Sequence, residues 1–386
     1  MTSNNSIQGK YYIGLMSGTS ADGIDLALVN ISNQQTKPKL VASFYQAYSS
    51  ELAKRITALY VPGTNEVDSA FHLDIELAHL FAKAVTNLLI QENLKAIDIA
   101  AIGNHGQTIR HRPSGDNPFT LQIGCCQTLA TLTGIRVVGQ FRRKDMALGG
   151  QGAPLVPVFH QQLFAEQSQG CFVVNIGGIA NITYLPEQGS SDTVLGFDTG
   201  PGNALLDEWF TVNHPSNKYK YDKSGTWAAS GQVNQGLLNQ FMQDQYIIAQ
   251  APKSTGREYF NFDWLTHQLD KFTQGSTTLL PKDVQATLLA YTAHSIYQSI
   301  LALAEGGKVY ICGGGAHNDT LLESLLTLGA ETFEINTMQA VNLDGDQLEA
   351  MAFAWFAYAF DNKIVSNMPS VTGAKTTCTL GSEFLP

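Results

Sequence analysis

The sequence has few basic residues, and this scarcity excludes two classes of partner. Lysine and arginine number 23 against 33 aspartates and glutamates, which gives a formal net charge of -10. A nucleic acid or an anionic membrane as the main partner requires clustered positive charge, so we expect neither. A phosphate ligand stays compatible with this charge, because backbone N–H groups and helix N-termini bind anions without charged side chains.

Cysteine and long apolar runs are also scarce. The cysteines number five: Cys125, Cys126, Cys171, Cys312 and Cys378. They show no C-x-x-C spacing and no disulfide framework. The first ten residues are polar, unlike a signal peptide, and apolar runs such as 350–360 are shorter than the ~20 residues that span a bilayer. We therefore expect a cytoplasmic protein with reduced cysteines.

Several common catalytic and nucleotide-binding motifs are absent. The chain contains no G-x-x-x-x-G-K-[ST], no H-E-x-x-H, no G-x-S-x-G, and no G-x-G-x-x-G between a strand and a helix. These absences disfavour a Walker-type nucleotide site, a zinc protease, an α/β-hydrolase and a dinucleotide enzyme. The 35 glycines therefore need another explanation.

Two segments with the same pattern supply that explanation. Residues 11–15 alternate like a strand, 17–23 form a polar turn with glycine, serine and aspartate, and 24–31 resume as a strand. Residues 171–185, CFVVNIGGIANITYL, repeat strand, Gly-rich turn and strand. A tight turn of this kind exposes backbone N–H groups on one side, which is the geometry of an anion nest. One such turn in each half of the chain predicts a nucleotide-handling enzyme built from two related domains.

The remaining pattern indicates an α/β protein of two domains. Helical spacing predicts helices over 67–91, 281–307 and 347–360, and short apolar runs predict strands over 97–102 and 308–312. A chain of 386 residues is long for one core. We expect an N-terminal domain over 1–135, completed by 361–386, and a second domain over 136–360.

Three Gly-dense turns follow buried-type strands. They are 17–23, 175–181 (NIGGIAN) and 312–318 (CGGGAHN). Each alone reads equally well as an ordinary turn, for which glycine, serine and aspartate are the usual residues. Together they favour a nucleotide, with phosphate at the first two turns and adenine against the triple glycine, where the backbone approaches a flat ligand closely.

Asp198 is the candidate general base. It follows an apolar strand over 194–197 and precedes TGPGN. A carboxylate at the end of a strand in an α/β sheet lies where ligands usually bind. The alternative is a helix cap, but Asn203 is also well placed to cap the next helix, which would leave Asp198 free. We favour Asp198 as the proton acceptor for an attacking hydroxyl or water.

Other polar side chains suit a hydroxylated ligand. His105, Gln107 and Thr108 come after the predicted strand over 97–102. Glu349 opens an apolar helix, where it is equally well a partner of the helix dipole. Two interpretations fit the basic cluster 142–144 and Arg257. By default these side chains are solvated, and alternatively they contact a carboxylate or a phosphate.

The longest motifs carry a specific resemblance. They are GLMSGTSADGID, GNHGQT, FRRKDMALGGQGAPLVP, NIGGIANIT, GFDTGPGN, PKSTGREYF, LLPKDVQATL, ICGGGAHN and SVTGA. In this order, from residue 13 to about 381, the chain resembles the anhydro-N-acetylmuramic acid kinase family. That family is part of the superfamily of actin, heat-shock chaperone ATPases and sugar kinases. The resemblance implies a two-domain, actin-like (RNase H-like) α/β fold with ATP and substrate in an interdomain cleft.

The resemblance also implies an activity and its residues. The expected reaction is ATP-dependent opening and phosphorylation of 1,6-anhydro-N-acetylmuramic acid in peptidoglycan recycling, with Mg²⁺, in a protein expected to form a homodimer. Asp198 would activate the water, while His105, Gln107, Thr108 and Glu349 would contact the sugar. The expected ATP-binding residues are Gly18, Thr19, Ser20, Ala21, Asp22, Gly23, Ile24, Asp25, Gly177, Gly178, Gly313, Gly314, Gly315 and Asn318.

Two other functions fit the same loops. A different sugar or acetate-type kinase of this superfamily would keep the ATP loops and Asp198 but would need no hydrolytic water. A chaperone-like or actin-like ATPase would turn over ATP without any sugar. The polar residues Gln107, Thr108 and Glu349 favour a small hydroxylated substrate over that second alternative.

Overall fold

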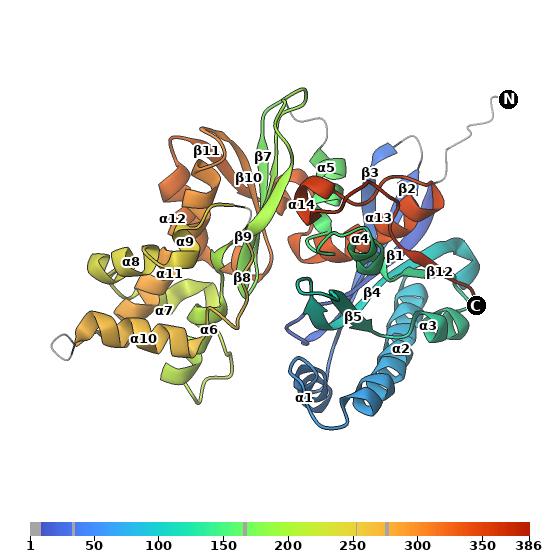
Figure 1. Cartoon of the computed structure of the whole chain (residues 1–386), viewed down its shortest axis with the longest axis horizontal. Helices are drawn as coiled ribbons and strands as arrows, with labels where there is room; N and C mark the ends of the chain where they lie inside the picture. The colour runs from blue at the N-terminus through green and yellow to red at the C-terminus, as the bar shows by residue number, and fades with distance from the viewer. Residues whose placement is uncertain (1–8, 33–34, 165–167, 252, 275–277) are drawn as a thin grey trace. The chain divides into compact units, whose positions relative to one another are not determined.

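The computed structural model describes residues 9–32, 35–164, 168–251, 253–274 and 278–386 (Figure 1). The chain divides into two compact units, Met1–Leu163 with Gln347–Pro386, and Phe164–Asp346. The sequence analysis puts these boundaries at 135/136 and 360/361 instead. The domain assignment, and the cleft expected between the domains, stay predictions.

The first unit contains a seven-stranded sheet in the order β12-β6-β4-β1-β2-β3, with β5 paired to β4. Strands β1 to β3 form an antiparallel meander, and β4 and β6 add in parallel on the other side of β1. The strands are β1 (Lys10–Ser17), β2 (Gly23–Ser32), β3 (Gln35–Ala47), β4 (Ile99–Arg112), β5 (Phe119–Ile123), β6 (Val137–Gly139) and β12 (Ser382–Phe384).

The second unit repeats this arrangement in a five-stranded sheet, β11-β10-β7-β8-β9. Strands β7 to β9 form the antiparallel meander, and β10 and β11 add in parallel beside β7. The shared order confirms the predicted duplication and the α/β fold class. The strands are β7 (Cys171–Ile176), β8 (Ile179–Leu185), β9 (Leu195–Pro201), β10 (Gly307–Cys312) and β11 (Phe333–Thr337).

The helices confirm the three segments predicted from helical spacing, as α2, α11 and α13 (Figure 1). The α-helices of the first part of the chain are α1 (Ser50–Ala58), α2 (Glu66–Gln91), α3 (Cys126–Thr133), α4 (Phe141–Ala147) and α5 (Val156–Phe164). Those that follow are α6 (Ala204–Asn213), α7 (Thr226–Ala229), α8 (Gln235–Met242), α9 (Gln245–Ile248), α10 (Phe262–Thr273), α11 (Pro281–Leu301), α12 (Asp319–Gly329), α13 (Leu348–Asp361) and α14 (Pro369–Thr372). Short 3₁₀ turns are η1 (Ala96–Asp98), η2 (Lys223–Gly225), η3 (Gly314–His317), η4 (Met338–Val341) and η5 (Gly345–Gln347).

Helix α13 packs on β1, β2 and β4 of the first sheet, which is why residues 347–360 lie in the first unit. Two glycines permit this close approach. A Cβ at Gly14 would lie 1.7 Å from the Ala350 carbonyl oxygen, and one at Gly103 would lie 1.9 Å from that of Phe353. Any side chain at either position would push the helix off the sheet, and with it the helix start that carries Glu349.

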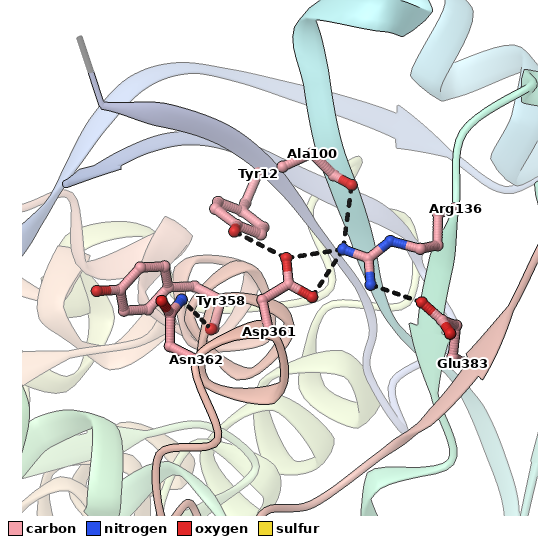
Figure 2. Close-up of polar contacts among 7 residues, drawn as sticks. All are labelled: Tyr12, Ala100, Arg136, Tyr358, Asp361, Asn362 and Glu383. Atoms are coloured by element: carbon pink, nitrogen blue, oxygen red, sulfur yellow. Dashed lines mark hydrogen bonds and ion pairs between the residues drawn. The ribbon is translucent and has the colours of Figure 1, made fainter. Parts of the chain in front are cut away.

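An ion-pair network fixes the other end of α13 (Figure 2). The Arg136 guanidinium contacts Asp361 at 2.7 Å and Glu383 at 2.8 Å, and the Tyr12 hydroxyl donates to Asp361 at 2.9 Å. These contacts join α13 and the C-terminal strand β12 to β1 and β6.

Among the described residues, no helix is long and apolar enough to cross a membrane.

Candidate active site

The turn between β1 and β2 is the predicted first phosphate loop. It closes with a hydrogen bond from the Ala21 amide to the Gly18 carbonyl at 3.1 Å, and Ala21 adopts the left-handed φ of 52°. The Tyr60 hydroxyl donates to the Thr19 carbonyl at 2.8 Å. The N–H groups of Thr19 and Ser20 have no acceptor among the described residues. This loop therefore presents unused donors of the kind that bind a phosphate.

Gln107 supports this loop from within the protein. Its Oε1 lies 2.6 Å from Ser17 Oγ, and its Nε2 donates to the Gly18 carbonyl at 3.0 Å. Gln107 is fully buried and Ser17 is 1% exposed. The Tyr48 hydroxyl lies 2.7 Å from Ser17 Oγ and completes the network. The side-chain amide of Gln107 is thus engaged in positioning the predicted first phosphate loop, and the predicted contact of Gln107 with the sugar stays a prediction.

His105 and Gln107 do not follow the predicted strand over 97–102 but lie within the longer strand β4. A bulge interrupts the pairing: Leu15 lies opposite Asn104, but Ser17 lies opposite Gln107. Gly106 absorbs the extra residue with a φ of 76°. In a regular strand, residues 105 and 107 would share a face. The bulge instead lets Gln107 reach the first loop while His105 packs on α13.

His105 is held between α13 and Arg142. Its ring lies 4.7 Å from that of Phe353, its Nδ1 is 2.8 Å from the Gly106 carbonyl, and Arg142 Nε donates to its Nε2 at 3.0 Å. These contacts assign the proton to Nδ1 and leave Nε2 as the acceptor. Burial, followed by the charge of Arg142, lowers the pKa of His105 well below its ordinary value. His105 is therefore a neutral imidazole at physiological pH.

The charge of Arg142 also acts on Glu349, although the two side chains form no hydrogen bond or ion pair among the described residues. Glu349 is half-buried in the first turn of α13, and its carboxylate has no hydrogen bond among the described residues. Burial raises the pKa of Glu349, and the positive charge of Arg142 opposes this shift. His105 and Glu349, 244 positions apart in the sequence, thus share one cation. The sequence analysis treats Arg142 as a solvated residue by default, and only its position after β6 could have suggested this role.

The predicted second phosphate loop joins β7 to β8. The carbonyls of Gly177 and Gly178 accept from the amides of Asn203 and Gly202, at 2.8 and 2.9 Å, and so hold the start of α6. The N–H groups of both glycines have no acceptor among the described residues. A Cβ at Gly177 would meet only the Ile179 carbonyl, at 3.5 Å, so this side of the loop is open to a ligand.

Asn203 differs from its predicted role. It precedes α6 but its side chain does not cap that helix; Nδ2 donates instead to the Ile176 carbonyl at 3.2 Å. The carbonyl of Gly178 accepts from the Ala204 amide at 3.0 Å. The loop after β7 packs tightly on the start of α6, and this packing directs the Asn203 side chain toward the end of β7.

The triple-glycine loop packs directly on the second phosphate loop. A Cβ at Gly313 would lie 2.2 Å from Asn175 Oδ1, and one at Gly315 would lie 2.3 Å from Ile176. Gly314 is open, with only Asn203 Nδ2 at 3.8 Å. The structure thus brings together two of the three predicted nucleotide loops. The carboxamide oxygen of Asn318 caps α12 by accepting from the Leu321 amide at 3.1 Å, which leaves only its NH₂ group for a ligand.

Asp198 lies inside β9, opposite Asn181, and not at the end of a strand as the sequence analysis expects. Its Oδ2 accepts from the Ser254 hydroxyl at 2.9 Å and from the Thr255 amide at 3.0 Å. Its Oδ1 has no hydrogen bond among the described residues. Burial raises the pKa of Asp198, although its two hydrogen bonds oppose the shift. A carboxylate held by one oxygen, with the other free and more basic than usual, is suited to accept a proton.

The segment that holds Asp198 also carries Arg257. The Arg257 guanidinium lies over the second phosphate loop, 2.7 Å from the position of a Cβ on Gly178. Burial raises the pKa of Asp207, in α6, to about 7, while the charge of Arg257 lowers it. The sequence analysis did not select Ser254, Thr255 or Asp207. Ser254 and Thr255 stand in the motif PKSTGREYF, but the motif alone does not indicate which distant carboxylate they contact, and Asp207 lies outside the quoted motifs.

No group of three or more His, Cys, Asp or Glu side chains forms a metal cage in the described part of the chain. Mg²⁺ does not require one, since it usually binds one or two carboxylates together with substrate phosphates and water. Asp22 is exposed in the first loop, where its Oδ1 accepts from the Ser20 hydroxyl at 2.9 Å. The donor set of this loop therefore fits a metal that arrives with a nucleotide.

Comparison with known proteins identifies the family. The model of the family "Anhydro-N-acetylmuramic acid kinase" matches residues 10–386. The chain belongs to the anhydro-N-acetylmuramic acid kinase family. It is 65% identical to the kinase of that name from Colwellia psychrerythraea, over 100% of both chains. It is 49% identical to the one from Shewanella oneidensis, over 97% of this chain and 98% of that one. The family predicted from the motifs is confirmed.

Two solved structures that resemble this kinase do so only distantly. An activator of 2-hydroxyisocaproyl-CoA dehydratase from Clostridium difficile, with bound ADPNP, is 11% identical with a TM-score of 0.45, covering 91% of this chain and 95% of its own. A ROK family glucokinase from Streptomyces griseus, in complex with glucose and AMPPNP, is 11% identical with a TM-score of 0.39. The match covers 89% of this chain and 98% of the glucokinase chain. At these scores the likeness supports no argument about the site of the anhydro-N-acetylmuramic acid kinase.

Proposed function

We propose that this kinase uses ATP to phosphorylate O6 of 1,6-anhydro-N-acetylmuramic acid while water opens the anhydro bridge. The products are N-acetylmuramic acid 6-phosphate and ADP, and the reaction serves peptidoglycan recycling. Membership of the family over residues 10–386 supports the substrate. The observation that carries the chemistry is Asp198, a half-buried carboxylate with raised pKa, one oxygen of which has no hydrogen bond to the residues that the structure describes.

Asp198 is the proposed general base. Its Oδ1 takes a proton from a water molecule whose oxygen forms a bond to the anomeric carbon. The bond between that carbon and O6 breaks, and its electron pair stays on O6. O6 then bonds to the γ-phosphorus of ATP as ADP leaves. Ser254 and Thr255 hold the other carboxylate oxygen and so orient Oδ1 toward the water.

The backbone of the glycine loops is the proposed phosphate cradle. Unused N–H groups at Thr19, Ser20, Gly177 and Gly178 support this assignment. Phosphoryl transfer requires mainly positioning and charge neutralisation, which fixed donors supply without reorganisation. Mg²⁺ bound to the phosphates, with Asp22 as the proposed protein carboxylate, supplies further neutralisation of charge. Gly314 offers its open backbone to the adenine.

The sugar is proposed to contact His105, Thr108 and Glu349. The half-buried Glu349 carboxylate and the Thr108 hydroxyl supply donors and acceptors for sugar hydroxyls. Both ring nitrogens of His105 are engaged by Gly106 and Arg142, so His105 would contact the sugar through its ring carbons. Gln107 acts behind them by holding the first loop. A homodimer and a cytoplasmic location, where ATP is available, remain part of the proposal.

Mass spectrometry of the product in water labelled with oxygen-18 tests the proposal. The full-length protein is incubated with the anhydro sugar, ATP and Mg²⁺. We expect a sugar phosphate that carries one labelled oxygen at the anomeric carbon and one ADP per sugar. A phosphorylated product without the label would indicate a plain sugar kinase. ATP turnover that does not depend on the sugar would indicate an ATPase and overturn the proposal.

A further inference from the structure

Arg142 differs from the other partly buried arginines of the first unit. Arg136 contacts two carboxylates (Figure 2), and Arg110 contacts Glu66 at 2.7 Å. Arg142 is half-buried, yet it forms no ion pair in the described part of the chain. A guanidinium withdrawn from water without a carboxylate partner is costly, and burial lowers the pKa of Arg142 to about 10.

Within the described residues, Arg142 donates hydrogen bonds only to neutral acceptors. Nε donates to the neutral His105 at 3.0 Å, and Nη1 donates to the Gly152 carbonyl at 2.8 Å. The nearby Asp145 is engaged elsewhere: it accepts from the Gly152 amide and from the Thr372 hydroxyl, both at 2.8 Å. Glu349 acts on Arg142 only at longer range. Both N–H groups of Nη2 and one of Nη1 are therefore unused within the described residues.

These contacts fix the guanidinium for a ligand. Two contacts on the Nε and Nη1 atoms hold its plane, as expected for a group preorganised to bind an anion. The unused N–H groups on Nη1 and Nη2 have the spacing that a carboxylate accepts in a bidentate pair.

The proposed substrate supplies the missing anion, since it is a sugar acid. We propose that Arg142 binds the carboxylate of the sugar substrate and so selects the acid over the same anhydro sugar without it. This inference rests on the proposed function. ATP is a less suitable partner, because the unused backbone donors of the glycine loops already serve its phosphates, whereas Arg142 shares His105 and Glu349 with the sugar site.

Two substrates and two variants test this assignment. Activity is measured as kcat/KM on 1,6-anhydro-N-acetylmuramic acid and on 1,6-anhydro-N-acetylglucosamine, which lacks the acid side chain. The wild type is expected to prefer the acid. Arg142→Gln keeps a donor for His105 or Gly152 but removes the charge. It should reduce kcat/KM on the acid roughly ten- to hundredfold more than on the acid-free sugar, and so reduce the preference for the acid by that factor.

The control is Lys144→Gln, an exposed cation on the same short helix that has no hydrogen bond to the described residues. It should leave the preference unchanged. An equal loss on both sugars for Arg142→Gln would overturn the inference, because Arg142 would then act only by positioning His105. If Arg142→Gln does not fold, Arg142→Lys is measured in its place. In that variant, an unchanged preference for the acid together with an unchanged KM for the acid would also overturn the inference. Failure of the wild type on both sugars would instead contradict the proposed function.

Discussion

Replacing Asp198 by asparagine separates proton transfer from structure. The carbonyl oxygen of asparagine can take the place of Oδ2 and accept from Ser254 and Thr255, whose bonds are 2.9 and 3.0 Å long. The NH₂ group then occupies the position of Oδ1, which has no hydrogen bond within the described part of the chain. The substitution keeps the local contacts but removes the group that accepts the proton from water.

The expected loss in kcat is roughly 10²- to 10⁴-fold, the usual contribution of a positioned general base. Stability should not fall. Burial raises the pKa of Asp198 above its ordinary 3.8, so ionisation of this carboxyl costs more free energy in the folded than in the unfolded protein. A neutral asparagine removes this cost, and the melting temperature near neutral pH should be equal or higher.

ADP release in the presence of the anhydro sugar measures the loss, and ATP binding by calorimetry shows that the nucleotide site is intact. The wild type should also lose kcat/KM on the acid side at a higher pH than an ordinary carboxyl would require, because the base must be ionised. Asp198→Asn should lack that acid limb. Asp192→Asn, an exposed neighbour in the same unit, serves as control. Turnover by Asp198→Asn within about threefold of wild type would refute the assignment, since it lies below the range given for a general base.

Three further results are expected. Gly177→Ala should raise the KM for ATP roughly tenfold without changing the melting temperature. The added Cβ meets only a carbonyl oxygen at 3.5 Å within the protein, and the loss of one hydrogen bond to a charged group weakens binding by about that factor. An unchanged KM would exclude the loop from ATP binding. Gln107→Leu should lower the free energy of unfolding by about 1–3 kcal/mol, measured in urea, and raise the KM for ATP, because the Gly18 carbonyl loses its donor; normal values of both would contradict this supporting role. Burial lowers the pKa of His160 to about 3, so its contribution to stability is lost as pH falls through the ordinary value of 6.5. Between about pH 7.5 and about pH 5.5, the free energy of unfolding of His160→Gln should therefore fall by about 1.4 kcal/mol less than that of wild type. An equal fall in the two proteins would show that His160 is protonated in the folded state.

The sequence by itself determined the local structure and the family. The hairpins, α2 and α13 follow from short-range periodicity, and the glycine loops follow from residue types that suit tight turns. The order of long motifs sufficed to assign the kinase family, because each motif is a contiguous segment. Asp198 also emerged as the candidate base from its position beside an apolar strand.

Only the tertiary structure decided which distant groups act together. Helix α13 is apolar on every side, so its pattern did not specify a sheet; Gly14 and Gly103 admit it to the first one. The bulge at Gly106, which directs His105 and Gln107 to different partners, depends on pairing between β1 and β4. Arg142 meets His105 37 positions away in the chain, and Asp198 meets Ser254 56 positions away. Contacts of this length depend on packing between elements, and no local pattern in the sequence encodes them.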